Sequence, residues 1–296
     1  MLVYERVEEP EVVGGEGLIY LATRVSRKVG RPEEIAEELN DLSRVRRLLK
    51  MIVKAGHFSV LEHSLVRLRV RADWGKLAQL LFKYKYLEVT PDGDHLLISL
   101  NPRTALEMLK DSREEVKELA KVALKGFPII REAVGMSPGG KPELDVSMRR
   151  LSEDPMVYSF VVEPYVPEVH GFYAFWAEMS RVASHQFVRH RRLSFTQRSG
   201  RYTRPDGFLL PKVGEEALKV MREHCARSYE VYEKLLEMGL RREDARYVLP
   251  AALRTALFVS GRQSDWNHFF ELRTDVHAQE EIRRIALIMA DAVGWK

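Results

Sequence analysis

The segment from Arg181 to Arg204 holds the chain's densest concentration of residues that can bind an anion. It contains seven arginines, two histidines and no acidic residue, in a chain whose net charge is only +4. Hydroxyl and amide side chains and one glycine stand among the arginines, a mixture that lets backbone N–H groups approach a phosphate. The planar guanidinium also suits bidentate recognition of a phosphate or a pyrimidine edge. This arginine segment therefore predicts a site for a phosphorylated ligand, with a solvated helix end paired to distant acids as the alternative.

The overall composition excludes several classes of protein. The 296 residues are 45% hydrophobic and 30% charged, with 47 Lys plus Arg against 43 Asp plus Glu. This balance is typical of a globular enzyme and excludes a collagen-like, disordered or disulfide-stapled chain. The single cysteine, Cys225, cannot form an internal disulfide, and no apolar run approaches the ~18 residues of a membrane span. We therefore expect a cytoplasmic protein with no membrane partner.

Two further groups could carry chemistry, and neither is expected to. His57, Glu62 and His63 lie close in sequence, but the two histidines do not fall on one helical face and no third ligand is evident. A loop or strand-end cluster satisfied by hydrogen bonds is expected there, and no metal. Cys225 lies on the apolar face of a predicted helix, which indicates a structural thiol.

The elements that must position these residues predict an α+β fold, with long helices packed on antiparallel sheet. An aromatic-rich stretch at 169–188 is predicted as a long helix leading into the arginine segment. The other predicted helices cover 31–56, 74–87, 104–124, 211–239, 243–259 and 265–293. Strands are predicted at 64–72, 96–100 and 157–162, short strand pieces within 1–30, and a linker at 136–142.

Four separated motifs occur in an order that identifies a known family. Arg189-His190-Arg191 is followed, after seven residues, by Ser199-Gly200-Arg201-Tyr202. The other three motifs are His-Phe-Ser-Val-Leu-Glu-His at 57–63, Ala-Arg-Tyr-Val-Leu-Pro at 245–250, and Phe-Phe-Glu-Leu-Arg at 269–273 leading into 277–283. Together they resemble the flavin-dependent thymidylate synthases and cover about half of the chain.

The resemblance implies a reaction and its participants. The reaction is methylation of dUMP to dTMP, with methylenetetrahydrofolate as carbon donor, reduced FAD as reductant and NADPH to regenerate it. No protein nucleophile is needed, because the flavin carries the difficult chemistry. The implied assembly is a homo-oligomer, a homotetramer or a dimer if the chain is duplicated, and no nucleic acid is involved.

The resemblance also assigns site residues position by position. Arg273 is the implied catalytic residue, since a fixed guanidinium can stabilise negative charge at N3 and O2 of the pyrimidine. The implied dUMP contacts are Gln186, Arg189, Gln197, Ser199, Gly200, Arg201, Arg246 and Arg273. The implied FAD contacts are Ser59, Asn101, Arg103, Arg189, His190, Arg191, Gln197 and His268. Gln197 stands where the family often has Glu, and an amide cannot accept a proton at neutral pH. For Arg246 and Arg273 taken alone, salt bridges to Asp244 and Asp275 are the simpler interpretation.

The chain departs from the family pattern in two places. The Glu62-His63 pair precedes Arg189 by far more residues than in the family, and the flavin element Asn-x-Arg is missing at 262–264. That element occurs instead as Asn101-Pro102-Arg103, in a similar local context. We hypothesise a tandem, partly degenerate duplication, with an N-terminal copy at 1–135 and a C-terminal copy with Arg-His-Arg at 145–296. A large insertion between 72 and 156 is the alternative.

Two other functions stay open at this level. The loss at 262–264 allows a nucleotide-binding family member with an impaired flavin site and no turnover. The arginine segment alone would also suit a nucleic-acid-binding protein.

Overall fold

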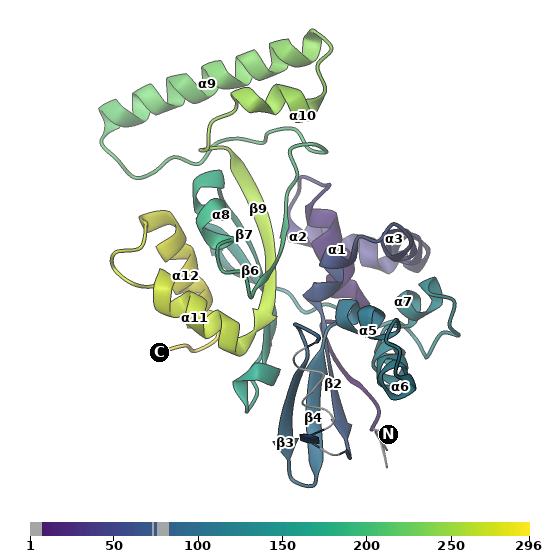
Figure 1. Cartoon of the computed structure of the whole chain (residues 1–296). Helices are drawn as coiled ribbons and strands as arrows, with labels where there is room; N and C mark the ends of the chain where they lie inside the picture. Colours follow the sequence, from purple (N-terminus) through teal and green to yellow (C-terminus); the bar gives the residue numbers. More distant parts are fainter. Residues whose placement is uncertain (1–7, 73, 76–82) are drawn as a thin grey trace.

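Two antiparallel sheets form the framework of the computed structural model, which describes residues 8–72, 74–75 and 83–296 (Figure 1). The first sheet has the order β1-β2-β4-β3: β1 (Glu11–Val13), β2 (Leu65–Val70), β4 (His95–Leu100) and β3 (Glu88–Asp92). The second has the order β5-β6-β7-β9-β8: β5 (Arg149–Glu153), β6 (Met156–Glu163), β7 (Phe172–Ser180), β9 (Arg254–Arg262) and β8 (Ser194–Gln197).

The helices form two groups, one with each sheet, and each sheet with its helices makes up one half of the molecule (Figure 1). The N-terminal half contains α1 (Gly15–Val25), α2 (Pro32–Ala36), α3 (Leu42–Lys54), α5 (Pro102–Met108), α6 (Glu114–Ala123) and α7 (Pro128–Ala133). The C-terminal half contains α8 (Arg181–Phe187), α9 (Glu215–Glu237), α10 (Arg242–Ala245), α11 (Gln263–Arg273) and α12 (Glu280–Ala292). A shared core joins the halves, because Leu18 and Leu21 of α1 pack with Trp176 and Phe258 of the second sheet. None of the helices described is both long and apolar enough to span a membrane.

The predicted α+β class is confirmed, but the predicted long helix at 169–188 is wrong. This stretch forms a short 3-10 turn, η4 (Glu168–His170), then the strand β7 and the seven-residue helix α8. Because β7 lies between β6 and β9 and is buried along nearly its whole length, its sequence is a continuous apolar run without alternation. Such a run cannot be told from a buried helix by periodicity alone.

Other predicted elements have mixed outcomes. The strands at 64–72, 96–100 and 157–162 and the helix at 211–239 are confirmed, as is the absence of regular structure at 136–142. The predicted helix at 243–259 is wrong, because the chain there forms α10, a 3-10 turn and the start of β9. The single helices predicted at 31–56, 104–124 and 265–293 are each interrupted by turns. The helix predicted at 74–87 lies largely outside the described residues.

The prediction of strand pieces through residues 1–30 is confirmed for β1 and wrong for Gly15–Val25, which form α1. Residues 1–7 lie outside the described part of the chain. Gly15 and Gly17 are needed in α1 for close packing rather than as helix breakers. A Cβ on Gly17 would lie 2.5 Å from the carbonyl oxygen of Leu144, and the Gly17 N–H donates to the Glu143 carbonyl at 3.0 Å. The segment at Glu143 and Leu144, which directly follows the predicted linker at 136–142, is therefore packed directly against α1.

Candidate functional site

A cavity of about 300 Å³ lies where the ends of α8 and β9 meet the pair α9 and α10. Its lining includes Tyr232, Tyr247 and five arginines against a single acid, Asp206; the arginines are Arg181, Arg198, Arg204, Arg246 and Arg254. Figure 1 shows the long helix α9 across the top of the molecule, above these strand ends. The cavity is therefore strongly basic.

Not all of this positive charge is neutralised by the protein. Arg198 pairs with Asp206 at 2.5 Å, while Arg204 and Arg254 also contact carboxylates. Within the described residues, Arg181 and Arg246 have no acidic partner; Arg246 Nε donates only to a backbone carbonyl. Burial, and then the charge of Arg246, lowers the pKa of the Arg181 guanidinium. Two guanidinium groups without a counter-ion in one cavity favour binding of an anion such as a phosphate.

The loop Ser199-Gly200-Arg201 borders this cavity and is anchored by α1. The Ser199 N–H donates to the carbonyl of Ser26, at the end of α1, at 3.1 Å. The backbone of Gly200 faces Arg246, and a Cβ there would lie 3.4 Å from Arg246 Cδ. Arg201 instead pairs through Nε with Glu243 at 2.7 Å and does not line the cavity. Of the three predicted phosphate contacts in this loop, only Gly200 is part of the cavity wall.

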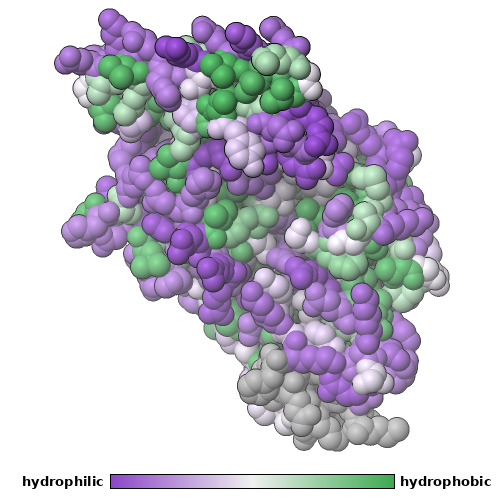
Figure 2. Space-filling view, turned by 45° about the horizontal axis from the view of Figure 1, so that its top comes forward, coloured by the Kyte–Doolittle hydropathy of each residue, from purple (hydrophilic) through white to green (hydrophobic). Residues whose placement is uncertain are grey.

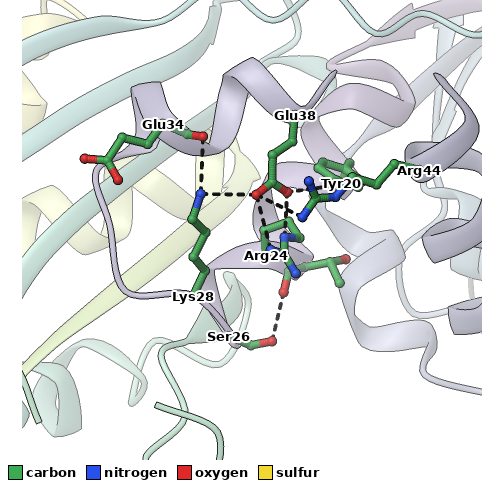
Figure 3. A network of polar contacts seen from close by, with 8 residues as sticks. Tyr20, Arg24, Ser26, Lys28, Glu34, Glu38 and Arg44 are labelled. Carbon is green, nitrogen blue, oxygen red and sulfur yellow. Dashed lines mark hydrogen bonds and ion pairs between the residues drawn. The ribbon is translucent and has the colours of Figure 1, made fainter. Parts of the chain in front are cut away.

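A polar network around Glu38 holds the end of α1 in place (Figure 3). The Glu38 carboxylate accepts hydrogen bonds from Tyr20 at 2.7 Å, Arg24 at 2.8 Å and Lys28 at 3.1 Å. Burial opposes ionisation, but these donors outweigh it and lower the pKa of Glu38 to about 2. The charged network therefore fixes the helix end that carries the Ser199 loop.

A second cluster forms where α11 ends beside α8. Arg273 donates from Nε to His190 Nε2 at 2.9 Å, and from NH2 to the carbonyl of Gln186 at 3.3 Å. Burial, followed by the charges of Arg273 and His268, lowers the pKa of His190 to about 4. The imidazole is thus neutral at pH 7 and can accept this hydrogen bond. The His190 ring also packs edge-on against Phe269, so the side chain that orients the Arg273 guanidinium is itself fixed in position.

The salt bridges that were the simpler interpretation of Arg246 and Arg273 are absent from the described residues. Asp244 approaches Arg241 at 3.7 Å, and Asp275 bonds His277 at 2.8 Å. Arg246 and Arg273 therefore have charge that the protein does not neutralise.

The other predicted residues of the arginine segment surround these two clusters. Gln197 donates to Ser184 Oγ at 3.0 Å and to Thr255 Oγ1 at 3.2 Å, and Thr255 lines the cavity. The side chain of Gln186 bonds Gln279. Arg189 and Arg191 are exposed, and no described residue gives their side chains a hydrogen bond or ion pair. His268 lies with its ring 6.3 Å from that of His190.

The predicted FAD contacts of the N-terminal half lie at the junction between the halves. Arg103 pairs with Glu62 at 2.5 Å, and Glu62 accepts from Ser194 at 2.6 Å, directly after the Arg-His-Arg stretch. The Asn101 side chain caps α5 and lines a cavity of about 20 Å³, which has room for about one water molecule. Ser59 is exposed on the 3-10 turn η2 (Phe58–His63).

The structure thus divides the predicted nucleotide site into two parts. Gly200 and Arg246 face the basic cavity, whereas Gln186, His190 and Arg273 form the second cluster and are not among the residues lining that cavity. Sequence reasoning gave no individual role to Arg181, although it belongs to the acid-free arginine segment. Arg254 was missed, because its segment was predicted as helix.

Cys225 and His63 have the structural environments that their sequence interpretations predicted. Cys225 is buried on α9 without a disulfide, and burial raises the pKa of its thiol. His63 is hydrogen-bonded on both ring nitrogens at the start of β2, so the predicted strand-end cluster is confirmed. Among the residues that the structure describes, no three His, Cys, Asp or Glu side chains are grouped to hold a metal ion.

The C-terminal half of the chain is similar to proteins of a known family. Residues 166–294 match the family described as Thymidylate synthase complementing protein. The flavin-dependent thymidylate synthase of Sulfurisphaera tokodaii is 42% identical over 130 residues, which are 42% of this chain and 51% of that protein. The protein of the same name from Saccharolobus solfataricus is 43% identical over 42% of this chain and 50% of its own length. That from Pyrococcus furiosus is 33% identical over 50% of this chain and 66% of its own length. The chain therefore spans about half the length of the first of these relatives, and its resemblance to the flavin-dependent thymidylate synthases is confirmed for the C-terminal part.

Proposed function

We propose that this chain, whose C-terminal part is related to the flavin-dependent thymidylate synthases, methylates dUMP to dTMP with methylenetetrahydrofolate as carbon donor. The observation that carries the proposal is the presence of two separate arginine sites that have no acidic partner among the described residues. Arg181 and Arg246 face one cavity and suit the phosphate, while Arg273, held by a neutral His190, suits the uracil ring. When bound, reduced FAD would supply the reducing equivalents, and NADPH would regenerate it.

Each protein group has a definite task in this scheme. Arg273 stabilises negative charge on the pyrimidine at N3 and O2, and its fixed position means that little reorganisation is needed. The neutral His190 holds Arg273 without adding a second positive charge beside it. Gln197 can orient ligands through its amide but cannot take a proton at neutral pH. The raised pKa of Cys225 leaves no activated thiolate, which agrees with a reaction that uses no protein nucleophile.

The residues of the arginine segment also fit an anionic flavin nucleotide. Arg189 and Arg191 are exposed cations without partners in the described part of the chain, so their donors are free for a pyrophosphate. We propose that they hold FAD together with His190, Gln197 and His268. Ser59, Asn101 and Arg103 would approach it from the N-terminal half, to which Glu62 and Ser194 connect the segment.

We further propose that the site is completed between copies of the chain. In such an assembly the basic cavity of one copy would lie beside Arg273 of another, since the two parts have no lining residue in common within one chain. The helix α9 and the residue that follows it present apolar side chains to solvent, with Val220 64% and Met238 67% exposed. Figure 2 shows apolar patches among hydrophilic residues at the top of the molecule, over α9 and α10. We propose a homodimer, or a homotetramer if the N-terminal half is not a family copy, in the cytoplasm.

Mixing two inactive variants tests this assembly. Arg246→Ala and Arg273→Ala should each have activity well below that of wild type, Arg273→Ala by about 100-fold or more, but subunits exchanged between them would form some sites with both arginines intact. Recovered activity after mixing supports shared sites. No recovery, with subunit exchange verified by mass, would refute them.

The decisive experiment measures flavin binding and product formation together. Purified protein incubated with FAD should retain a flavin absorption band, and dUMP should shift that band. With methylenetetrahydrofolate and NADPH added, dTMP should form. Protein that stays colourless after incubation with FAD and forms no dTMP would overturn the proposal. Binding of dUMP by protein that retains no flavin and forms no product would support the alternative with an impaired flavin site and no turnover.

The ion pairs of the arginine segment do not favour the nucleic-acid-binding alternative. Four of its seven arginines pair with carboxylates of the same chain: Arg192, Arg198, Arg201 and Arg204. Oligonucleotide binding that falls steeply with salt, together with indifference to dUMP, would reverse this conclusion.

A further inference from the structure

The two sheets of the molecule share one strand order and one register. The order β1-β2-β4-β3 of the first sheet is repeated by β6-β7-β9-β8 of the second, and all neighbours are antiparallel. Ser99 of β4 pairs with Arg67 of β2, and Ser260 of β9 pairs with Ala174 of β7. The opposite neighbours keep the same register: Glu88 beside Ser99, and Ser194 beside Ser260. Each half then continues from this central strand into two helices, α5 and α6 or α11 and α12.

A pair of buried histidines connects the halves in a reciprocal way. His63 lies two positions before the start of β2, and its ring nitrogens bond Ser260 Oγ at 2.8 Å and Thr196 Oγ1 at 2.9 Å in the second sheet. His170 precedes β7 at the matching place. Its partners lie in the first sheet: Ser99 Oγ at 2.5 Å and Thr90 Oγ1 at 2.7 Å. Each histidine thus reaches from one half to the same two positions of the other, as two identical subunits related by a twofold axis would do.

The shared register identifies the residues of the N-terminal half that correspond to the Arg-His-Arg motif of the C-terminal half. Glu88 corresponds to Ser194. Counting back five residues from each therefore places Lys83-Tyr84-Lys85 at the positions of Arg189-His190-Arg191. In each half, two residues separate the tripeptide from the outer strand, β3 or β8. The N-terminal half therefore keeps two cations but has lost the imidazole and both guanidinium groups.

The side chain that contacts the middle residue of the tripeptide is a cation in the C-terminal half and an anion in the N-terminal half. His190 receives Arg273, which the helix after the central strand brings to it. Tyr84, at the corresponding position, donates at 2.5 Å to Asp111, which follows the corresponding helix α5. Asp111 also pairs with Lys83 at 2.6 Å and with Arg113 at 2.9 Å, whereas no described residue gives Arg189 or Arg191 a carboxylate.

A second substitution fills the junction on the same side. Arg262 occupies the place of Asn101, because each is the residue that precedes the helix after the central strand. Its buried guanidinium donates to the Tyr86 carbonyl at 2.6 Å and pairs with Glu88 at 3.3 Å. The space beside the N-terminal tripeptide is thus occupied by a protein side chain.

We propose that the N-terminal half is a second copy of the unit at 145–296 whose nucleotide site has been closed by its own ion pairs, so that each chain binds one nucleoside monophosphate. This inference rests on the proposed function, since the open site is the one proposed for dUMP. Closure combines the loss of the Arg-His-Arg side chains, the carboxylate of Asp111 against Lys83 and the Arg262 guanidinium in the junction.

Calorimetric titration of the full-length, FAD-loaded protein with dUMP tests the number of open sites. One dUMP per chain is expected. Lys83→Met should leave the stoichiometry unchanged and the affinity within twofold. Its matched control, Arg189→Met, changes the corresponding position of the other copy and should weaken binding at least tenfold. Two dUMP per chain, or equal losses in both variants, would overturn the closure.

A measurement without ligand separates this inference from the proposed function. Asp111→Asn should lower Tm by about 2–4 °C, and adding Lys83→Met should cause less than the sum of the single losses. An unchanged Tm or strictly additive losses would show that these charges do not close anything. If the wild-type chain bound no dUMP while this coupling was present, the proposed function would fail and the closed copy would stand.

Discussion

Arg273 donates a hydrogen bond from Nε to Nε2 of His190 across 2.9 Å, although the two residues are 83 positions apart in sequence. The geometry requires a neutral imidazole, because only a deprotonated Nε2 can accept. Burial, and then the charges of Arg273 and His268, lowers the pKa of His190 to about 4 and so secures that state at neutral pH. The guanidinium is consequently oriented without being neutralised, which is what stabilisation of a developing anion requires.

Replacing Arg273 should reduce turnover more than nucleotide binding. Arg273→Ala removes a charge that matters most when the pyrimidine becomes anionic, so kcat should fall about 100-fold or more, roughly 2.7 kcal/mol. The dissociation constant for dUMP should rise less than tenfold. Single-turnover kinetics and a separate dUMP titration would measure the two effects. Equal losses in both would contradict this role.

His190 acts by positioning Arg273, and pH should reveal that role. Since its pKa in the folded protein is about 4, the acceptor state persists as pH falls through 6.5, and orientation is lost only near pH 4. We expect His190→Ala to lower kcat about tenfold (~1.4 kcal/mol) with little change in the KM for dUMP. A wild-type kcat profile that falls with an apparent pKa near 6.5, and loses that step in the variant, would show that the imidazole titrates normally.

Arg181 should contribute to recognition of the phosphate. It faces the cavity beside Arg246 and has no acidic partner in the described residues, so an anion would relieve the repulsion between the two guanidinium groups. Arg181→Met should weaken dUMP binding about tenfold or more, ~1.4 kcal/mol, and leave the weaker binding of deoxyuridine unchanged. Arg204→Met is a matched control, since Arg204 lines the same cavity but approaches Glu233 at 3.6 Å. Equal losses for dUMP and deoxyuridine would exclude a phosphate contact.

The sequence could predict the residues of the site better than their arrangement. Motif spacing gave Arg273 and the Arg-His-Arg stretch as candidate site residues, and alternation predicted β2, which the structure confirms. The strand β7 could not be predicted, because a strand buried on both faces lacks alternation. Which arginines remain unpaired depends on distant acids such as Glu178 and Glu243, whose proximity no spacing reveals. The bonds of His63 to the second sheet likewise depend on tertiary packing alone.

Cys225 should be dispensable for activity. It is buried on α9 and burial raises the pKa of its thiol, so the thiolate that a nucleophile requires is scarce at neutral pH. Cys225→Ala should retain at least half of the wild-type kcat/KM for dUMP, with a modest fall in Tm from the lost packing. A folded Cys225→Ala variant without activity would undo the proposal that no protein nucleophile takes part.

Acid should destabilise the chain through the two buried histidines that join its halves. Burial lowers the pKa of His63 to about 3; burial, and then the charges of Arg262 and Arg67, lowers that of His170 to about 4. Both titrate near 6.5 when unfolded. Above pH 6.5 neither state binds these protons, and stability does not depend on them. As pH falls from 6.5 towards 4, the unfolded chain takes up protons that the folded chain excludes, so the free energy of unfolding drops by up to ~1.4 kcal/mol per pH unit for each histidine.

Denaturant unfolding of wild type, His63→Gln and His170→Gln at several pH values would measure this dependence. Each variant should be less stable at pH 7.5, because bonds between the halves are weakened. Its stability should nevertheless fall less steeply than that of wild type between pH 6.5 and 4.5, by about the share of one proton. Taking the difference between proteins at each pH cancels the carboxylates that both contain, such as Glu38. Parallel curves for wild type and both variants would show that these histidines are not held neutral in the fold.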